Sequence, residues 1–268
     1  MQAFGEVIAT AFSPTGTTKK VVDTVARAAA EGLSLPLWEV PYTLLPDRKR
    51  ILPFNEGQLV VFGVPVYAGR VPNLLRRELQ TLQGNGATAV PVVVYGNRGY
   101  DDALLELWDL LQGAGFSPVS GAAFIGEHSF SRVLAAGRPD GQDLLLAGRF
   151  GRAVAQKLRE GGKRTTQVKG RFPYRPYYMP RDAGGQPVDF RRIKPKTGPG
   201  CTHCGLCQKV CPMGSIQDAQ TVGICIKCGA CIKRCPVGAR YIDDPDYLRH
   251  KVELEQACTC RKEPELFL

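Results

Sequence analysis

The sequence of 268 residues predicts an α/β protein in two parts, a doubly wound sheet of five parallel strands and a small α+β module rich in cysteine. Two observations predict the sheet. Short apolar runs alternate with amphipathic segments over residues 1–150, and runs such as LVVFGVPV lack the alternation of polar and apolar residues that a half-exposed strand shows. The cysteines indicate the second part, because all ten lie beyond residue 200.

Five strands and four helices are expected to alternate along the first part. The apolar runs predict strands at residues 6–12, 35–40, 59–66, 89–95 and 118–124, and the amphipathic segments predict helices at residues 17–31, 73–82, 100–112 and 141–159. Gly32, Gly84 and Gly113 lie where three of these helices should end, in the position that favours glycine. A doubly wound sheet binds its ligand at the carboxyl ends of the strands, beside the point where the strand order reverses.

Composition excludes several classes of protein. Hydrophobic residues make up 44% of the chain, so it is neither disordered nor fibrous, and no apolar run approaches the ~20 residues of a membrane-spanning helix. The first ten residues lack the basic and apolar regions of a signal peptide. We therefore expect a cytoplasmic protein without a membrane span, in which the cysteines stay reduced and bind metal.

The basic charge of the chain is confined to one segment. The formal net charge is +10, and residues 151–200 alone hold 13 Lys and Arg against 3 Asp and Glu. Periodicity also ends here. Residues 161–197 are rich in Pro, Gly, Arg and aromatics, which predicts a linker between domains at residues 1–160 and 198–268. Part of the linker should pack against a domain, because it holds four closely spaced aromatic residues, Phe172, Tyr174, Tyr177 and Tyr178.

Eight of the cysteines form an internal repeat. The pattern Cys201-x2-Cys204-x2-Cys207-x3-Cys211-Pro212 recurs 24 residues later as Cys225-x2-Cys228-x2-Cys231-x3-Cys235-Pro236. This spacing resembles that of bacterial ferredoxins, in which three cysteines of one copy and the fourth cysteine of the other copy hold each [4Fe-4S] cluster. The resemblance implies one cluster on Cys201, Cys204, Cys207 and Cys235, and a second on Cys225, Cys228, Cys231 and Cys211.

A pair of structural zinc sites is the alternative interpretation, because CxxC pairs also bind zinc. The third and fourth cysteines recur at the same spacing in both copies, which favours the clusters. Cys258 and Cys260 lie outside the repeat and are too few to hold a third cluster, so we interpret them as reduced thiols without a metal.

A phosphate site is predicted where the first strand ends. The segment Ser13-Pro14-Thr15-Gly16-Thr17-Thr18 places hydroxyl groups and a glycine directly before a helix, whose N-terminus attracts anions. It matches neither the G-x-x-x-x-G-K-[ST] loop nor the G-x-G-x-x-G turn of dinucleotide sites. By itself the segment is also compatible with a helix that is merely well capped.

Two further loops favour a ligand at this edge of the sheet. The sequence PVYAGRVP, residues 65–72, follows the third strand, and YGNRGYDD, residues 95–102, follows the fourth strand. Both loops leave the carboxyl ends of strands that should be neighbours, and both carry aromatic residues able to stack on a planar ring. Together with the phosphate site they predict that one FMN binds here.

The three loops resemble those of flavodoxins, whose phosphate loop reads T-x-T-G-x-T where this chain has Ser13-x-Thr15-Gly16-x-Thr18. With the cysteine repeat, the whole chain resembles the flavodoxin–ferredoxin fusion proteins of the ferrodoxin family. That resemblance implies a flavodoxin-like FMN domain followed by a 2[4Fe-4S] ferredoxin domain. It implies phosphate contacts from Ser13, Thr15, Gly16, Thr17 and Thr18, one wall of the ring site from Pro65, Tyr67 and Ala68, and the other wall from Gly96, Asn97, Arg98 and Tyr100.

His128 follows the fifth strand, at the same edge of the sheet as the flavin loops. Imidazole donates hydrogen bonds and protons near neutral pH, so His128 is a candidate catalytic residue toward a reduced flavin or a substrate. The alternative is a loop histidine that bonds the backbone.

These features favour an electron-transfer protein that couples one-electron and two-electron carriers through two [4Fe-4S] clusters and FMN. Its expected partners are redox proteins such as a ferredoxin or an acceptor reductase. The second hypothesis is a flavin-dependent reductase of a small-molecule substrate, fed by an external ferredoxin, and the third is a binding module with structural metal. Arg and Tyr mix in the linker as in single-strand nucleic-acid binders. Because the linker lies between two redox centres, we instead expect it to clamp the domains together or to form a docking face for an acidic electron donor. We expect no binding of nucleic acid.

Overall fold

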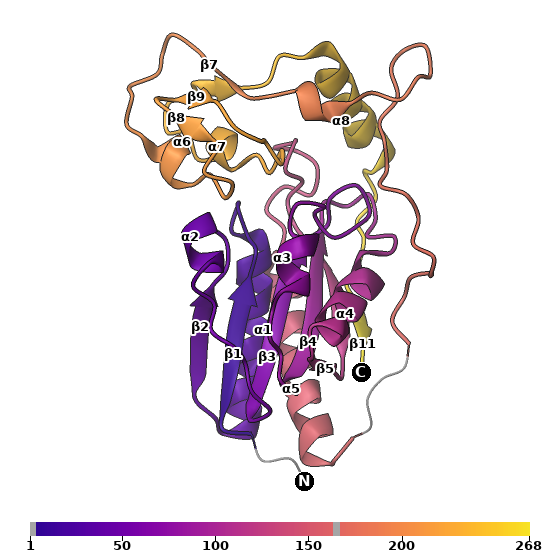
Figure 1. Cartoon of the computed structure of the whole chain (residues 1–268). Coiled ribbons are helices and arrows are strands. Elements are labelled where there is room, and N and C mark those ends of the chain that lie inside the picture. The colour runs from indigo at the N-terminus through magenta and orange to yellow at the C-terminus, as the bar shows by residue number, and fades with distance from the viewer. Residues whose placement is uncertain (1–3, 163–166) are drawn as a thin grey trace.

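A parallel sheet of five strands forms the body of the N-terminal domain (Figure 1). The computed structural model describes residues 4–162 and 167–268. The five strands are β1 (Glu6–Ala11), β2 (Leu37–Pro41), β3 (Gln58–Pro65), β4 (Thr88–Tyr95) and β6 (Gly121–Ile125). They lie in the order β2-β1-β3-β4-β6, which is the 2-1-3-4-5 order of flavodoxin-like sheets. The expected doubly wound, flavodoxin-like fold is therefore confirmed.

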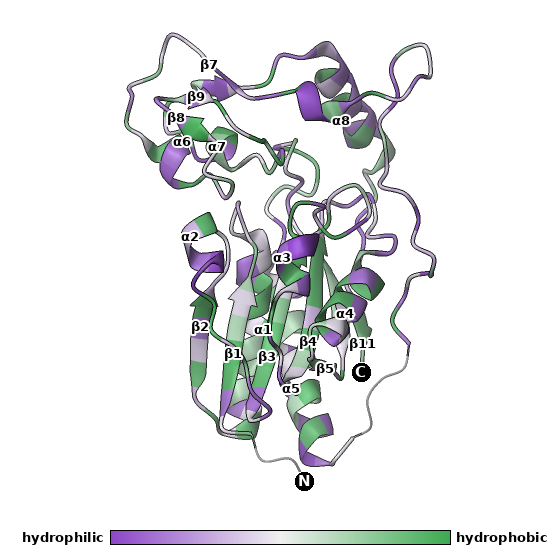
Figure 2. Ribbon diagram, viewed as in Figure 1, coloured by the Kyte–Doolittle hydropathy of each residue, from purple (hydrophilic) through white to green (hydrophobic). Residues whose placement is uncertain are grey.

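Helices cover both faces of this sheet, and the short α2 (Leu45–Arg48) follows β2. On one face α1 (Thr17–Leu33) and α5 (Gly141–Arg159) bury an apolar core with the strands, and on the other face α3 (Arg76–Gln80) and α4 (Ala103–Gly113) bury a second core. The central strands β3 and β4 are buried on both faces, and Figure 2 colours most of their residues hydrophobic. No helix of the described segments is long and apolar enough to cross a membrane.

The far edge of the sheet is more complex than the single strand expected at residues 118–124. The two-residue strand β5 (Ser117–Pro118) pairs with the start of β4, and the chain then continues into β6. The C-terminal strand β11 (Glu265–Phe267) pairs antiparallel with β6, with Leu266 opposite Ala122. The end of the chain thus extends the sheet of the N-terminal domain, which the sequence pattern did not indicate.

The linker is anchored on the buried carboxylate of Asp102. This side chain accepts hydrogen bonds from the backbone N–H groups of Arg171 (3.1 Å) and Arg175 (2.6 Å), and from the Arg175 guanidinium (2.7 Å). Asp102 is 0% exposed, so these donors compensate a carboxylate that has lost its water. Residues 163–166 of the expected linker lie outside the described residues.

Two linker tyrosines pack on a second buried charge. The Arg70 guanidinium lies 4.6 Å from the ring centroid of Tyr174 and 5.0 Å from that of Tyr177, and it donates two hydrogen bonds of 2.7 Å to Glu106, which is 0% exposed. Cation–π contacts of a desolvated guanidinium stabilise such packing. The expected packing of linker aromatics is confirmed for these two tyrosines, whereas Phe172 is 78% exposed.

The cysteine module shows the internal repeat in its backbone. Each copy contains a four-residue helix, α6 (Leu206–Lys209) or α7 (Ala230–Lys233), which follows a left-handed glycine. The φ angles of these glycines, Gly205 and Gly229, are 72° and 74°. The remaining elements are the short η1 (Phe190–Arg192), β7 (Lys196–Thr197), β8 (Ile216–Gln217), β9 (Gln220–Thr221) and β10 (Arg240–Tyr241), and the helix α8 (Pro245–Ala257).

This module lies over the carboxyl ends of the parallel strands (Figure 1). The Arg48 guanidinium donates to the carbonyl of Pro212 (3.0 Å), and Lys233 Nζ donates to the carbonyl of His128 (2.6 Å). The first contact joins helix α2 to the first cysteine repeat, and the second joins the loop after β6 to the second repeat. The edge where a doubly wound sheet binds its ligand therefore faces the cysteines.

Candidate functional site

The loop between β1 and α1 has the geometry of an anion site. Gly16 precedes α1 with φ 94°, a left-handed conformation that favours glycine. Ser13 Oγ accepts a hydrogen bond from the backbone N–H of Lys19 (2.9 Å), which holds the loop against the first helical turn. Among the described residues, no hydrogen bond takes the backbone N–H of Thr17 or Thr18. These groups lie at the positive end of a 17-residue helix and are able to donate to a phosphate.

The loops after β3 and β4 pack against each other beside this site. A Cβ atom built on Gly69 would lie 2.1 Å from the Asp101 carboxylate, so the two loops are in direct contact. Tyr67 and Arg70 close the first loop with two backbone hydrogen bonds of 3.0 and 3.1 Å. Ala68 at its tip is exposed, and Pro65 and Tyr67 are partly buried.

Tyr67 faces the cysteine module. Burial raises the pKa of its hydroxyl well above the ordinary value, and the nearby thiols of Cys228 and Cys225 raise it further. Tyr67 is therefore a neutral aromatic residue between the loop after β3 and the second cysteine repeat.

The C-terminal segment holds the side chains of the loop after β4. The Nδ2 group of Asn97 donates to the carbonyls of Cys258 (2.6 Å) and Cys260 (2.9 Å). The Tyr100 hydroxyl donates to Glu265 (2.8 Å), and its ring packs on Tyr95 with 3% exposure. The structure thus places Tyr100 in the core beneath the loop. The distance of more than 150 residues along the chain explains why sequence reasoning missed these contacts.

Arg98 and Gly96 lie in the same loop and contact other parts of the site. The Arg98 guanidinium lies 5.0 Å from the ring centroid of Tyr178 in the linker, and it donates to Asp101 (2.5 Å). A Cβ atom built on Gly96 would lie 2.3 Å from His128 Cδ2. The structure therefore brings His128 against the backbone of the loop after β4.

His128 is held by the backbone. Its Nδ1 accepts a hydrogen bond from the backbone N–H of Phe130 (3.1 Å). Burial lowers the pKa of His128 to about 4, and the charges of Lys233, His250 and Arg98 act in the same direction. The imidazole is therefore neutral at pH 7 and carries its proton on Nε2, from which it is able to donate a hydrogen bond.

The shifted pKa of His128 predicts a loss of stability in mild acid. Between pH 6.5 and 4 the unfolded state binds a proton that the folded state excludes, so the free energy of unfolding falls as the pH is lowered through this window. At pH 5.5 we expect a contribution of about 1 kcal/mol relative to pH 7.5. In thermal unfolding of His128→Gln, the difference in Tm between these two pH values should shrink. His203→Gln, at an exposed position, is the control, and an unchanged difference in His128→Gln would contradict the assignment.

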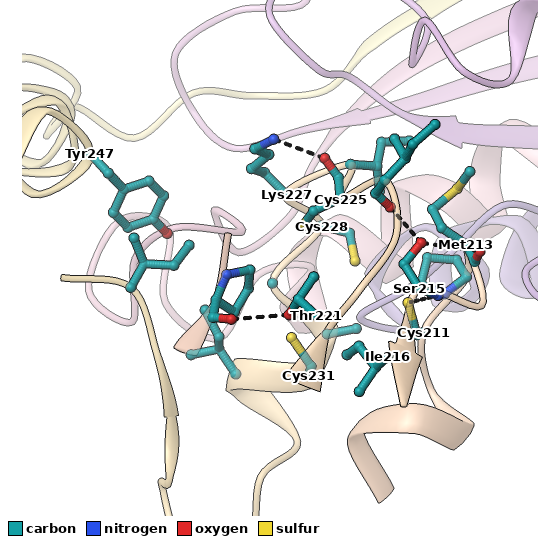
Figure 3. Close-up of a pocket in the computed structure, with 18 residues that line it drawn as sticks. Cys211, Met213, Ser215, Ile216, Thr221, Cys225, Lys227, Cys228, Cys231 and Tyr247 are labelled. Carbon is teal, nitrogen blue, oxygen red and sulfur yellow. Dashed lines mark hydrogen bonds between the residues drawn. The ribbon is translucent and has the colours of Figure 1, made fainter. Parts of the chain in front are cut away.

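Four of the cysteines line one cavity, which Figure 3 shows. They are the set Cys211, Cys225, Cys228 and Cys231, and apolar side chains from both repeats surround them. Burial raises the pKa of the Cys228 thiol, and it raises the pKa of the Cys231 thiol to about 11 despite the nearby Arg240 guanidinium. A metal centre that binds thiolates compensates this cost of burying their charge.

Two donors beside the cavity fit an anionic cluster. Arg240 is 3% exposed and lies next to the Cys231 thiol, and its Nε atom is buried without a hydrogen-bond partner among the described residues. The backbone N–H of Ser215 donates to Cys211 Sγ (3.3 Å). Donors of this kind stabilise the negative charge of sulfur ligands and tune the potential of a cluster. The donor set of this cavity therefore fits an iron–sulfur cluster.

The other four cysteines, Cys201, Cys204, Cys207 and Cys235, lie nearer the surface, with Cys204 exposed. The backbone N–H of His203 donates to Cys201 Sγ (3.4 Å). Burial acts to raise the pKa of Cys235, but backbone N–H groups of residues 237–240 outweigh it and lower the pKa. Within the described residues, no three His, Cys, Asp or Glu side chains surround a point where a single metal ion would fit.

The fold and these cysteines define a redox protein of the electron-transport class. A family model described as a 4Fe-4S binding domain matches residues 201–215 and 225–239, the two copies of the repeat. With the strand order of the N-terminal sheet, this match makes the chain a fusion of a flavodoxin-like domain with a ferredoxin-type domain.

Solved structures similar to this chain include flavodoxins. A flavodoxin from the domain Archaea is 14% identical with a TM-score of 0.40, and the match covers 57% of this chain and 99% of that one. A short-chain flavodoxin associated with a PDU bacterial microcompartment is 16% identical with a TM-score of 0.37, covering 58% and 98%. Rubredoxin oxygen:oxidoreductase from Desulfovibrio gigas is 14% identical with a TM-score of 0.38, covering 59% and 37%. No curated protein matches the sequence.

Proposed function

We propose that this chain passes electrons between two [4Fe-4S] clusters and one FMN, and so couples one-electron to two-electron carriers. One observation carries the proposal: Lys233, in the same repeat as Cys228 and Cys231 of the cavity, donates a hydrogen bond to the carbonyl of His128, at the carboxyl ends of the strands where the flavin loops lie. Short separation between centres is what electron transfer within one protein requires. The proposed domains are an FMN domain at residues 1–160, the linker at 161–197 and a ferredoxin domain at 198–268.

The residues of each proposed site have separate tasks. The segment Ser13–Thr18 would hold the FMN phosphate with its hydroxyl and N–H groups. Tyr67 and the backbone of residues 65–68 would form one wall of the ring site, and residues 96–98 would form the other wall above the buried Tyr100. Bound FMN supplies a centre that accepts one or two electrons. Cys225, Cys228, Cys231 and Cys211 would hold the cluster beside the flavin, and Cys201, Cys204, Cys207 and Cys235 would hold the outer cluster.

The exposed position of Cys204 indicates where electrons would enter or leave. A redox protein such as a ferredoxin, or an acceptor reductase, would approach this side of the module. Linker cations form ion pairs with acidic residues elsewhere in the chain: Arg175 with Asp102, Lys169 with Glu265, and Arg192 with Asp244. This pairing supports the clamp between domains over an acidic-donor docking face and over nucleic acid. Eight reduced cysteine ligands suit a reducing compartment such as the cytoplasm.

Binding of FMN tests the proposal. Thr15→Val with Gly16→Val removes a hydroxyl and forces a β-branched side chain into a left-handed position, so we expect flavin to be lost while iron stays unchanged. The measurement is flavin released per chain from anaerobically purified protein. Thr24→Val, a change at a partly buried position of the same helix, is the control and should keep its flavin. Full flavin occupancy in the double variant would count against the site.

A flavin-dependent reductase fed by an external ferredoxin is the second candidate, and the contact between His128 and Gly96 favours it. A neutral imidazole at the flavin loop would donate a hydrogen bond from Nε2 to a substrate. His128→Phe would then slow reduction of the substrate while reduction of the flavin by ferredoxin keeps its rate. If both rates in the variant equalled those of the wild type, the reductase role would be rejected and the electron-transfer role would remain.

A further inference from the structure

The two lysines nearest the phosphate loop, Lys19 and Lys20, are already paired with other groups of the flavodoxin-like domain. Lys19 Nζ donates to Asp23 (2.5 Å) and Glu39 (2.8 Å), and Lys20 Nζ donates to the carbonyl of Pro139 (3.1 Å). The loop itself offers hydroxyl and N–H groups but contains no Lys or Arg. A flavin phosphate carries close to two negative charges at pH 7. The loop therefore lacks a countercharge of its own for this group.

The cysteine module places a cation at this loop. The Nη2 atom of Arg234 lies 3.7 Å from the position that a Cβ atom on Gly16 would occupy. The Arg234 side chain is exposed, and no hydrogen bond or ion pair engages it among the described residues. The guanidinium is therefore available to a ligand bound at the N-terminus of α1.

Neighbouring contacts fix the backbone that carries Arg234. Lys233, one residue before it, donates to the Glu127 carboxylate and to the carbonyl of His128. A Cβ atom on Gly229, at the start of the same short helix, would lie 2.5 Å from the carbonyl oxygen of Ser129. The helix α7 is thus seated on the loop after β6, and this seating directs Arg234 toward the phosphate loop.

The internal repeat shows that cluster binding does not require this arginine. Residue 234 of the second copy corresponds to Val210 of the first copy, at the same distance from the cysteines. The preceding positions, Lys233 and Lys209, carry the same residue type in both copies. At this position an arginine appears only in the second copy, whose helix α7 contacts the loop after β6.

We infer that Arg234 completes the flavin phosphate site, so that FMN is bound by both domains at once. The inference rests on the proposed function and deepens it. The guanidinium and the N–H groups of Thr17 and Thr18 approach the phosphate from opposite domains, and guanidinium forms strong charge-assisted hydrogen bonds with phosphate. Bound FMN then ties the cysteine module to the sheet.

The test compares FMN with riboflavin, which lacks the phosphate. The Arg234→Met protein is stripped of flavin but keeps its clusters. We expect its Kd for FMN to be about tenfold higher than that of the wild type, because a charge-assisted contact is lost. Kd for riboflavin should not change. Inorganic phosphate should compete with FMN in the wild type and compete less well in the variant. Arg234→Lys keeps the charge and should recover part of the FMN affinity.

The matched control is Lys209→Met, which removes a positive charge from the other copy of the repeat. It should leave both flavin affinities unchanged. An unchanged Kd for FMN in Arg234→Met, or equal weakening of FMN and riboflavin, would overturn the inference. Wild-type protein that binds neither flavin would instead overturn the proposed function itself. Iron content, measured on every variant, shows that the module has stayed intact.

Discussion

Cys228→Ser is expected to lower the iron content from about eight to about four per chain, because it removes one ligand of the buried cluster and leaves the other ligand set complete. Cys228 is 8% exposed in the cavity that it shares with Cys211, Cys225 and Cys231. A serine there lacks the soft thiolate that an iron–sulfur cluster requires. The measurement is iron and acid-labile sulfide in anaerobically purified protein, together with the visible absorption of the clusters.

Two control variants separate the possible outcomes of this experiment. Cys258→Ser with Cys260→Ser should keep the full iron content, because both residues lie outside the repeat. Cys204→Ser should also lose about half of the iron, from the outer site. Zinc in place of iron in the anaerobic wild type would show that the module is a structural zinc domain, and the electron-transfer proposal would fail with it.

Glu106→Gln is expected to destabilise the N-terminal domain by about 3 to 5 kcal/mol, because it leaves the Arg70 guanidinium buried without its counterion. Glu106 is 0% exposed and accepts hydrogen bonds from the Arg70 side chain and from the backbone N–H of Val71 (2.9 Å). For a domain of this size the loss corresponds to a fall in Tm of about 10 °C. Thermal unfolding followed by circular dichroism measures it.

The same substitution should release the linker. Arg70 also donates to the carbonyl of Arg175 (2.5 Å), and Tyr174 and Tyr177 pack on its guanidinium. In limited trypsin digestion, cleavage after Arg171 should therefore be faster in Glu106→Gln than in the wild type. Glu253→Gln, which loses a half-exposed ion pair of α8, is the control and should cost less than about 1 kcal/mol. Equal digestion rates in Glu106→Gln and the wild type would show that docking of the linker does not depend on the Glu106 carboxylate.

The parts of the fold that depend on local pattern were predictable. The apolar strands and the loops that follow them have strong signals within ten to fifteen residues, and the cysteine repeat is visible from spacing alone. The edge strand β11 gave no such signal. Its three residues, Glu265–Phe267, are too few to show a period, and its pairing partner lies more than 140 residues earlier.

The charged contacts of the site also escaped prediction, for a related physical reason. Whether a carboxylate is buried depends on which distant segment covers it, as the linker covers Asp102 and Glu106. A signal existed in the sequence, because these two acidic residues stand one turn apart in the apolar helix around Ala103–Gly113. Asn97 escaped in the same way. Its place beside the flavin stays a prediction, whereas the hydrogen bonds of its amide to the carbonyls of Cys258 and Cys260 were not predicted.

The pairing of β11 with β6 changes how the two halves of the chain are connected. The cysteine module is tethered at both ends, by the docked linker on one side and by a strand of the N-terminal sheet on the other. A module held by two tethers stays near its partner surface at a high effective concentration. The proposed electron transfer between the cysteine module and the flavin site then needs no diffusional encounter. Removing residues after 197 would also strip β6 of its outer neighbour, so that the five-residue β6 would replace the three-residue β11 as the edge strand, where chains associate.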